Sequence, residues 1–226
     1  MENLLLFNVN KVSSKKVGRG VAIGGLVVAG VTGFAMMDQM VPKKAEDAKA
    51  LAVGTKVPDA MVMNLEGKET TTAKIAAMKP TVFIFYRGGW CPFCNRHLSE
   101  LRKAEAGLKE MGYQLVAVTP DLPSEIKKTM DKDELGYTIY SDSSATAMKA
   151  FGVAFEVDPG TVSMYKNNYK IDLEASSGQM HHILPVPSVF ISNGKGVIKF
   201  VHSNPDYKVR LSSEAVLDAA KAAMAN

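Results

Sequence analysis

The only two cysteines of the chain lie in the tetrapeptide Cys91-Pro92-Phe93-Cys94. A nearly continuous apolar run at residues 81–86 precedes them, which is typical of a buried central strand. The leucines that follow have helical spacing, so both thiols are predicted to lie in the first turn of a helix. Two thiols in that position can form and break a short disulfide, and the sequence therefore indicates thiol chemistry.

Strand-like and helical segments alternate through the middle of the chain, which predicts an α/β fold with parallel strands. A hairpin around Asn193-Gly194-Lys195-Gly196 and a final helix at 213–224 complete a predicted domain at 53–226. Residues 153–184 have few apolar runs, and we predict that they form an insertion. The predicted strands lie at 60–65, 81–86, 114–119 and 138–141, and the helices at 94–111, 124–132 and 145–151.

The N-terminal region has the pattern of an export or membrane segment. Residues 21–37 carry no charge, and as a helix they would span about 26 Å, slightly less than a hydrocarbon core of about 30 Å. The basic region 1–20 precedes them and a predicted linker at 38–52 follows, so the N-terminus is predicted to stay in the cytoplasm. The segment is predicted to be an inner-membrane anchor of a periplasmic domain. The alternatives are a signal peptide cleaved at Gly33-Phe34-Ala35, which would release the domain to the periplasm, and a buried helix of a soluble protein.

Composition narrows the classes of function. Hydrophobic residues make up 46% of the chain and charged residues 22%, which is typical of a globular protein. The net charge of +4 owes much to basic residues before position 20, and no basic face with interleaved aromatic residues is visible. We therefore expect no nucleic-acid partner.

The position of the two cysteines predicts their roles. A helix N-terminus carries partial positive charge and favours a thiolate, so Cys91 is predicted to be the attacking, more exposed thiol. Cys94 lies one turn further into the helix and would resolve the mixed disulfide. Pro92 stiffens the first turn and is expected to tune the redox potential. A zinc site would need two more ligands, for which only His181 and His182 are candidates, so neither a metal nor a cofactor is predicted.

Several further motifs give a family resemblance. They are Tyr86-Arg87-Gly88-Gly89-Trp90-Cys91-Pro92-Phe93-Cys94, Val118-Thr119-Pro120-Asp121, Tyr140-Ser141-Asp142, Phe151-Gly152-Val153, Leu184-Pro185-Val186-Pro187 and Pro205-Asp206-Tyr207-Lys208-Val209-Arg210-Leu211. Over about residues 53–224 the chain resembles the peroxiredoxin-like branch of the thioredoxin fold, the AhpC/TSA (alkyl hydroperoxide reductase and thiol-specific antioxidant) superfamily. The first and the last two of these motifs resemble those of its bacterial members that carry a CxxC pair. The resemblance implies a central mixed sheet flanked by helices.

The resemblance also implies roles for residues near the pair. Pro187 would be a cis proline that faces the CxxC pair, and the Val186 backbone would pair with an extended substrate. The alternative for Pro187 is a plain proline at the start of a strand. Trp90 is predicted to flank the site as an apolar lid, or else to belong to the core. Arg87 would lower the Cys91 pKa, or else be solvated.

One position departs from the typical peroxiredoxin pattern, Pro-x-x-x-Thr/Ser-x-x-Cys. Counting back from Cys91, the hydroxyl position holds Gly88 and the proline position holds Ile84. Without the hydroxyl that would orient a peroxide, fast peroxide reduction is not expected, although slow reduction is compatible with the sequence.

Three functions remain open. The first is a thiol–disulfide oxidoreductase acting on protein or small-molecule thiols and disulfides, served by a thioredoxin-like or membrane reductant. The second is a thiol peroxidase acting on hydroperoxides, and the third a copper chaperone resembling the Sco family, in which a histidine assists the cysteines. Otherwise His181 and His182 are interpreted as solvated, and Arg210 with Asp206 as a structural ion pair.

Overall fold

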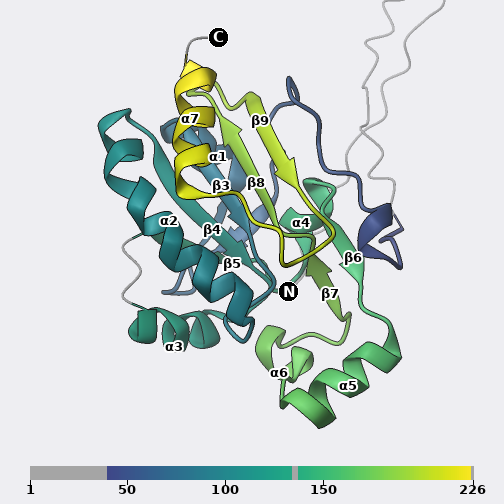
Figure 1. The fold of residues 1–226 in the computed structure, drawn as a ribbon. Coiled ribbons are helices and arrows are strands. Elements are labelled where there is room, and N and C mark those ends of the chain that lie inside the picture. The colour runs from purple at the N-terminus through teal and green to yellow at the C-terminus, as the bar shows by residue number, and fades with distance from the viewer. Residues whose placement is uncertain (1–39, 134–136, 225–226) are drawn as a thin grey trace, which may run out of the picture. The chain divides into compact units, whose positions relative to one another are not determined.

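A computed structural model describes residues 40–133 and 137–224 (Figure 1). The predicted basic region and apolar segment at 1–37 lie outside the described residues. Within the described residues, no helix is long and apolar enough to cross a membrane.

Seven strands of the described part form one mixed sheet in the order β2-β1-β5-β4-β3-β8-β9. The central strands β3, β4 and β5 are parallel, whereas β8 joins β3 in an antiparallel pair. This arrangement confirms the predicted α/β fold with a mixed sheet. The bounds are β1 Met61–Met63, β2 Glu69–Thr71, β3 Thr81–Phe85, β4 Gln114–Thr119, β5 Thr138–Ser141, β8 Ser188–Ser192 and β9 Ile198–Ser203.

Helices cover both faces of this sheet. Alternate residues of β3 point to opposite sides, and both sets are buried, which explains the continuous apolar run in the sequence. On one face, α2 (Pro92–Glu110) and α7 (Ser213–Met224) lie side by side (Figure 1). Buried residues of these two helices and of α3 (Pro123–Asp133) belong to one apolar cluster. On the other face lie α1 (Thr72–Met78) and α4 (Thr146–Ala150).

The segment predicted as an insertion is ordered. Two short strands, β6 (Ala154–Glu156) and β7 (Ile183–Pro185), pair as a separate antiparallel sheet. Between them lie α5 (Pro159–Tyr169) and α6 (Leu173–Ser177), each begun by an aspartate whose side chain accepts backbone N–H bonds. These helices pack below the main sheet in Figure 1 and carry their own small apolar cluster around Leu173 and Leu184.

The described part of the predicted linker lies against the domain. The Glu156 N–H donates to the Pro42 carbonyl at 2.8 Å, and the Leu51 N–H donates to the Phe151 carbonyl at 3.0 Å. Between them, the short helix η1 (Ala45–Asp47) packs against β6. Residues 42–51 are therefore part of the folded unit that surrounds the site.

Candidate active site

The CxxC pair begins α2 where the chain leaves β3. Cys91 is the N-cap residue, with extended backbone angles, and its carbonyl accepts the N–H groups of Cys94 at 3.0 Å and Asn95 at 3.1 Å. Pro92 is the first helical residue, where its missing N–H costs no hydrogen bond. The Cys91 sulfur therefore lies at the positive end of a 19-residue helix.

The two thiols are hydrogen-bonded to each other and have opposite pKa shifts. The Cys94 thiol donates to the Cys91 sulfur, which is the largest effect in lowering the Cys91 pKa to about 6. Burial raises the Cys94 pKa well above its usual value, and its role as donor adds to that shift. Both cysteines are free. This asymmetry fits the predicted roles of attacking and resolving thiol.

Cys91 is the more exposed of the two thiols, as predicted, but by a margin too small to distinguish them. Cys91 is 2% exposed and Cys94 1%, so both are buried. Both cysteines belong to the apolar cluster under α2, and the loop before α2 turns back on itself, so that the Cys91 N–H donates to the Gly88 carbonyl at 3.1 Å. A substrate can reach Cys91 only if neighbouring side chains move.

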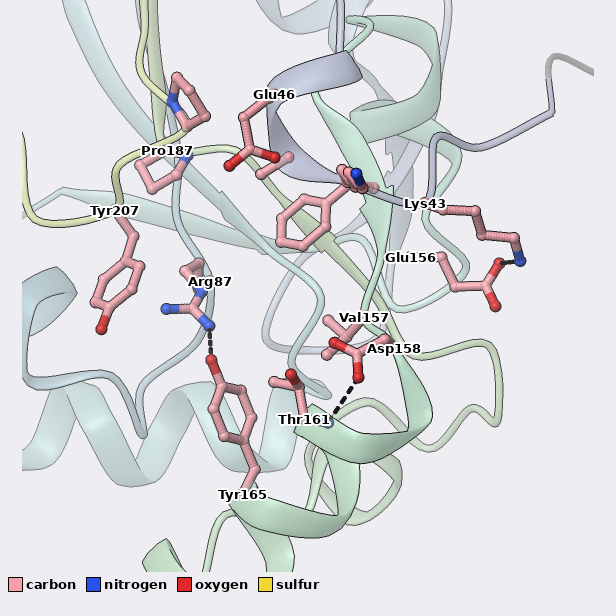
Figure 2. Close-up of a pocket in the computed structure, with 14 residues that line it drawn as sticks. Lys43, Glu46, Arg87, Glu156, Val157, Asp158, Thr161, Tyr165, Pro187 and Tyr207 are labelled. Carbon is pink, nitrogen blue, oxygen red and sulfur yellow. Dashed lines mark hydrogen bonds and ion pairs between the residues drawn. The ribbon is translucent and has the colours of Figure 1, made fainter.

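Arg87 is buried among aromatic rings rather than solvated (Figure 2). Arg87 is 5% exposed, and its guanidinium donates to the Tyr165 hydroxyl. The guanidinium carbon lies 4.5 Å from the ring centre of Tyr207, 5.2 Å from that of Trp90 and 5.7 Å from that of Tyr165. Its charge also contributes to the low pKa of Cys91, as one of the two sequence interpretations proposed.

Arg210 contacts the pair, and the predicted ion pair with Asp206 is wrong. An Arg210 Nη donates to Cys94 Sγ at 3.5 Å, while the Asp206 carboxylate accepts the Lys208 N–H at 3.0 Å. The segment is held to α2 by His97, whose Nε2–H donates to the Leu211 carbonyl at 3.0 Å. Burial lowers the His97 pKa to about 4, so this bond is made by a neutral ring. Sequence reasoning placed Arg210 in a family motif but did not identify its partner.

Asp121 is a buried acid that sequence reasoning treated only as part of a motif. It follows β4, is 2% exposed, and accepts the Gly89 N–H at 2.7 Å. Its second oxygen has no hydrogen-bond partner among the described residues. Burial raises the Asp121 pKa to about 7, and the charge of Cys91 contributes in the same direction. The available signal was its position after a strand parallel to β3, because carboxyl ends of parallel strands meet at one edge.

Trp90 joins the CxxC pair to the α5–α6 region. Its ring is half-buried and lies 5.9 Å from the Tyr165 ring. It packs against the apolar cluster under α2 and α7 and also against the small cluster around Leu173 and Leu184. Gly88 has φ +150°, and a Cβ there would lie 2.3 Å from Trp90 Nε1. The position at which peroxiredoxins carry a hydroxyl is thus occupied by a glycine because the indole ring takes that space.

The prediction of a cis peptide before Pro187 is wrong, since no cis bond occurs among the described residues. The trans form is the favoured one for X–Pro bonds. Pro187 lies beside Arg87 in one pocket, which neither cysteine lines. However, the Val186 N–H already donates to Val153 at 2.7 Å, and the Val186 carbonyl accepts from Ser188 Oγ at 2.8 Å. The Val186 N–H is therefore not free to pair with a substrate strand.

The two adjacent histidines are not simply solvated. His181 Nε2–H donates to the Ser143 carbonyl at 2.8 Å, while its Nδ1 accepts the Ile183 N–H at 2.9 Å. His182 Nε2 pairs with Glu174 at 2.8 Å. Over residues 40–133 and 137–224, no cluster of three His, Cys, Asp or Glu side chains could hold a metal ion. The histidines therefore serve the packing of α6 and β7.

Comparison with known proteins places the chain in a family. The family model described as the AhpC/TSA family matches residues 53–201. The bcp protein of Haemophilus influenzae, named as a peroxiredoxin, is 26% identical over 46% of this chain and 66% of its own length, just under two thirds. The thiol-disulfide oxidoreductase ResA of Bacillus cereus is 22% identical over 57% of this chain and 71% of its own length.

Solved structures support the same fold. Reduced Prx3 of Vibrio vulnificus in complex with hydrogen peroxide has a TM-score of 0.61 at 17% identity, over 75% of this chain and 99% of that one. Peroxidoxin BcpB of Mycobacterium tuberculosis has a TM-score of 0.57 at 18% identity, over 77% and 97%. The fold is that of the thioredoxin-like peroxiredoxins. The chain therefore belongs to the AhpC/TSA family and is an oxidoreductase.

Proposed function

We propose that this protein is a thiol–disulfide oxidoreductase in which Cys91 attacks and Cys94 resolves. One observation carries the proposal: the Cys94 thiol donates to a Cys91 sulfur whose pKa is lowered to about 6. A thiol with that pKa is roughly 90% thiolate at pH 7. Cys94 stays protonated because burial raises its pKa, so the pair holds one nucleophile and one thiol in reserve.

The exchange moves two electrons. The Cys91 thiolate attacks one sulfur of a substrate disulfide, a mixed disulfide forms, and the other substrate sulfur leaves as a thiolate. Cys94 then loses its proton and attacks the Cys91 sulfur, and the second substrate sulfur leaves. The products are the Cys91–Cys94 disulfide, one substrate thiol, which takes up the Cys94 proton, and one substrate thiolate. Run in reverse, the oxidised pair accepts two electrons from a substrate dithiol. We propose a thioredoxin-like or membrane-bound dithiol as the partner that resets the pair.

A thiol peroxidase is the second candidate, supported by the peroxiredoxin fold and by two guanidinium groups near the pair. In that reaction Cys91 attacks a hydroperoxide, an alcohol or water leaves, and Cys94 condenses with the sulfenic acid to release water. Gly88 argues against a fast version, because it offers no hydroxyl and Trp90 fills the space beside it.

Stopped-flow fluorescence separates the two candidates. Trp90 is the only tryptophan of the chain and is adjacent to Cys91, so it reports oxidation of the pair. The reduced full-length protein is expected to react with a small disulfide much faster than free cysteine does, and with hydrogen peroxide at about the rate of free cysteine. Cys91→Ser should abolish the reaction, whereas Cys94→Ser should stop at a mixed disulfide visible by mass spectrometry.

Two other outcomes would contradict the proposed thiol–disulfide exchange. A peroxide rate far above that of free cysteine would replace the first candidate by the second. Failure of the wild-type protein to react with either oxidant faster than free cysteine would reject both.

We also propose that residues 21–37 direct the domain to the periplasmic side of the inner membrane, on the basis of their uncharged sequence and the basic residues before them. Fractionation of cells and N-terminal sequencing of the recovered protein test this proposal. Recovery of the intact chain from the cytoplasmic fraction would reject it.

A further inference from the structure

We propose that the pocket beside Arg87 binds a carboxylate carried on a short apolar group, so that the preferred substrate is a small disulfide or thiol with such a carboxylate. For its link to catalysis this inference rests on the proposed thiol–disulfide exchange, whose substrate class it names. The binding of a carboxylate in the pocket is inferred separately, from the geometry around Arg87.

The cavity is large enough for a small organic acid. It has a volume of about 260 Å³ and lies between the loop after β3, the N-terminal part of α5, η1 and the segment after β9 (Figure 2). Its apolar walls suit a short aliphatic or aromatic group. They are formed by Phe155, Tyr165, Pro187, Pro205 and Tyr207.

Arg87 is the group in this pocket that lacks a counter-ion. It is 5% exposed, and none of the described carboxylates lies within ion-pair distance of it. Its hydrogen bond runs to the Tyr165 hydroxyl, and its Nε has no partner among the described residues. A buried charge without a partner is costly, and a guanidinium matches a carboxylate in geometry. A bound carboxylate would remove that cost.

The other charged residues at the pocket do not supply this selectivity. Lys43 pairs with Glu156, and the Asp158 carboxylate accepts the Thr161 N–H as the cap of α5. That leaves Lys44 and Glu46, which are of opposite sign and both exposed. The charges on the exposed rim cancel, so the buried guanidinium decides which ligand charge the pocket favours.

Arg87 also connects the pocket to the reacting sulfurs. Its backbone N–H donates to the Cys94 sulfur, while its charge lowers the Cys91 pKa. Its side chain lines the pocket. A carboxylate held by this residue would therefore anchor a small substrate beside a residue that contacts the pair, and the substrate sulfur would reach the buried Cys91 once neighbouring side chains move.

Charge selectivity tests the inference in the full-length protein. Rates are measured with 3,3′-dithiodipropionate, bis(2-hydroxyethyl) disulfide and cystamine, which are anionic, neutral and cationic, and each is divided by the rate of 2-mercaptoethanol with the same disulfide. We expect the anionic compound to be favoured over the neutral one by about tenfold or more. The ratio does not depend on how much Cys91 is ionised, so it separates substrate binding from thiolate activation.

Variants assign the preference to Arg87. Arg87→Gln should bring the anionic-to-neutral ratio close to one, and Arg87→Lys should keep part of it. The exposed Arg96, also near Cys91 in sequence, provides the matched control, because Arg96→Gln removes one positive charge outside the pocket. A ratio near one in the wild type, or an equal loss in Arg96→Gln and Arg87→Gln, would overturn the inference.

A second measurement needs no redox reaction. Titration with 3-phenylpropionate should change Trp90 fluorescence saturably, whereas 3-phenylpropanol and inorganic phosphate should bind at least tenfold more weakly. Glu46→Gln should tighten the binding of 3-phenylpropionate, because a like charge leaves the rim, and weaker binding would show that Glu46 belongs to the site as the partner of Arg87. Equal binding of the alcohol, or tighter binding of phosphate, would also overturn the inference.

The two measurements distinguish a failure of the pocket from a failure of the proposed exchange. Binding of 3-phenylpropionate without any disulfide reaction would uphold the pocket and reject the proposed exchange. Disulfide reaction without charge preference would uphold the exchange and reject the pocket.

Discussion

Two ionisable residues near Trp90, the base Arg87 and the acid Asp121, lie in surroundings that differ in openness. On one side Arg87 faces a pocket of about 260 Å³, with no carboxylate paired to it among the described side chains. On the other side Asp121 lies at a space of only about 10 Å³, shared with His181 and His182. The same short loop serves both sides, since it supplies the Arg87 side chain and the Gly89 N–H that holds Asp121.

The difference suggests two roles around one pair of thiols. The cationic side is open and favours a thiolate, so it is suited to meet a substrate. The acidic side is sealed, and its carboxyl group keeps a proton up to about pH 7 because burial raises the Asp121 pKa. The Trp90 ring lies close to Arg87 and also lines the space at Asp121, which makes its position the first feature to perturb.

Gly88→Ala should have the largest effect, because the new Cβ would lie 2.3 Å from Trp90 Nε1 and the backbone has φ +150°. We expect a loss of about 2–4 kcal/mol of unfolding free energy in urea, together with a changed Trp90 emission. Gly112→Ala is the matched control, since φ is +81° there and nothing lies within 4 Å. Equal losses in the two variants would mean that Trp90 moves aside at no cost.

Asp121→Asn should change how stability depends on pH. The Asp121 pKa is raised to about 7 in the folded state, from about 4 when unfolded, so the folded state holds the extra proton between those values. The wild-type protein loses this contribution as pH rises from about 4 to about 7, whereas the amide of the variant does not titrate. The variant should therefore gain up to about 3 kcal/mol relative to wild type across that range. Urea unfolding at several pH values measures it, and parallel curves would contradict it.

Arg210→Gln should have the smallest effect and tests the cationic side. The Arg210 guanidinium contacts Cys94 Sγ and lowers the Cys91 pKa less than Cys94 and Arg87 do. We expect the Cys91 pKa to rise by about one unit or less, read from the pH dependence of alkylation by iodoacetamide. Asp206→Asn, which touches no group of the pair, is the control. An unchanged pKa would restrict Arg210 to a structural role.

Local patterns in the sequence predicted much of the fold. The apolar run became β3, the helix at 213–224 became α7 with the same bounds, and the hairpin became β8 and β9. In each case the signal is a run or a spacing within about a dozen residues. The short helix α1 and strand β2 were missed, because they are brief and their stability comes from packing against the sheet.

The site was predicted less completely, because its contacts join distant segments. The position of Cys91 at a helix start follows from adjacent residues, whereas the largest cause of its low pKa is the hydrogen bond from Cys94, which the sequence argument did not use. The contact of Arg210 with Cys94 spans 116 positions, and that of Arg87 with Tyr165 spans 78. No spacing rule reaches that far, so both needed the folded structure. The same holds for the paired N–H of Val186, whose acceptor is the carbonyl of the distant residue Val153.

The hydrogen bonds that fix residues 42–51 bear on how the protein should be produced. Lys43, Lys44 and Glu46 complete one wall of the Arg87 pocket, although they precede the stretch that the family model matches. A shortened protein that began at residue 53 would keep the CxxC pair, the sheet and the flanking helices. It would nevertheless present a differently shaped pocket, and a substrate screen on it would rank compounds for a site that the longer chain does not have.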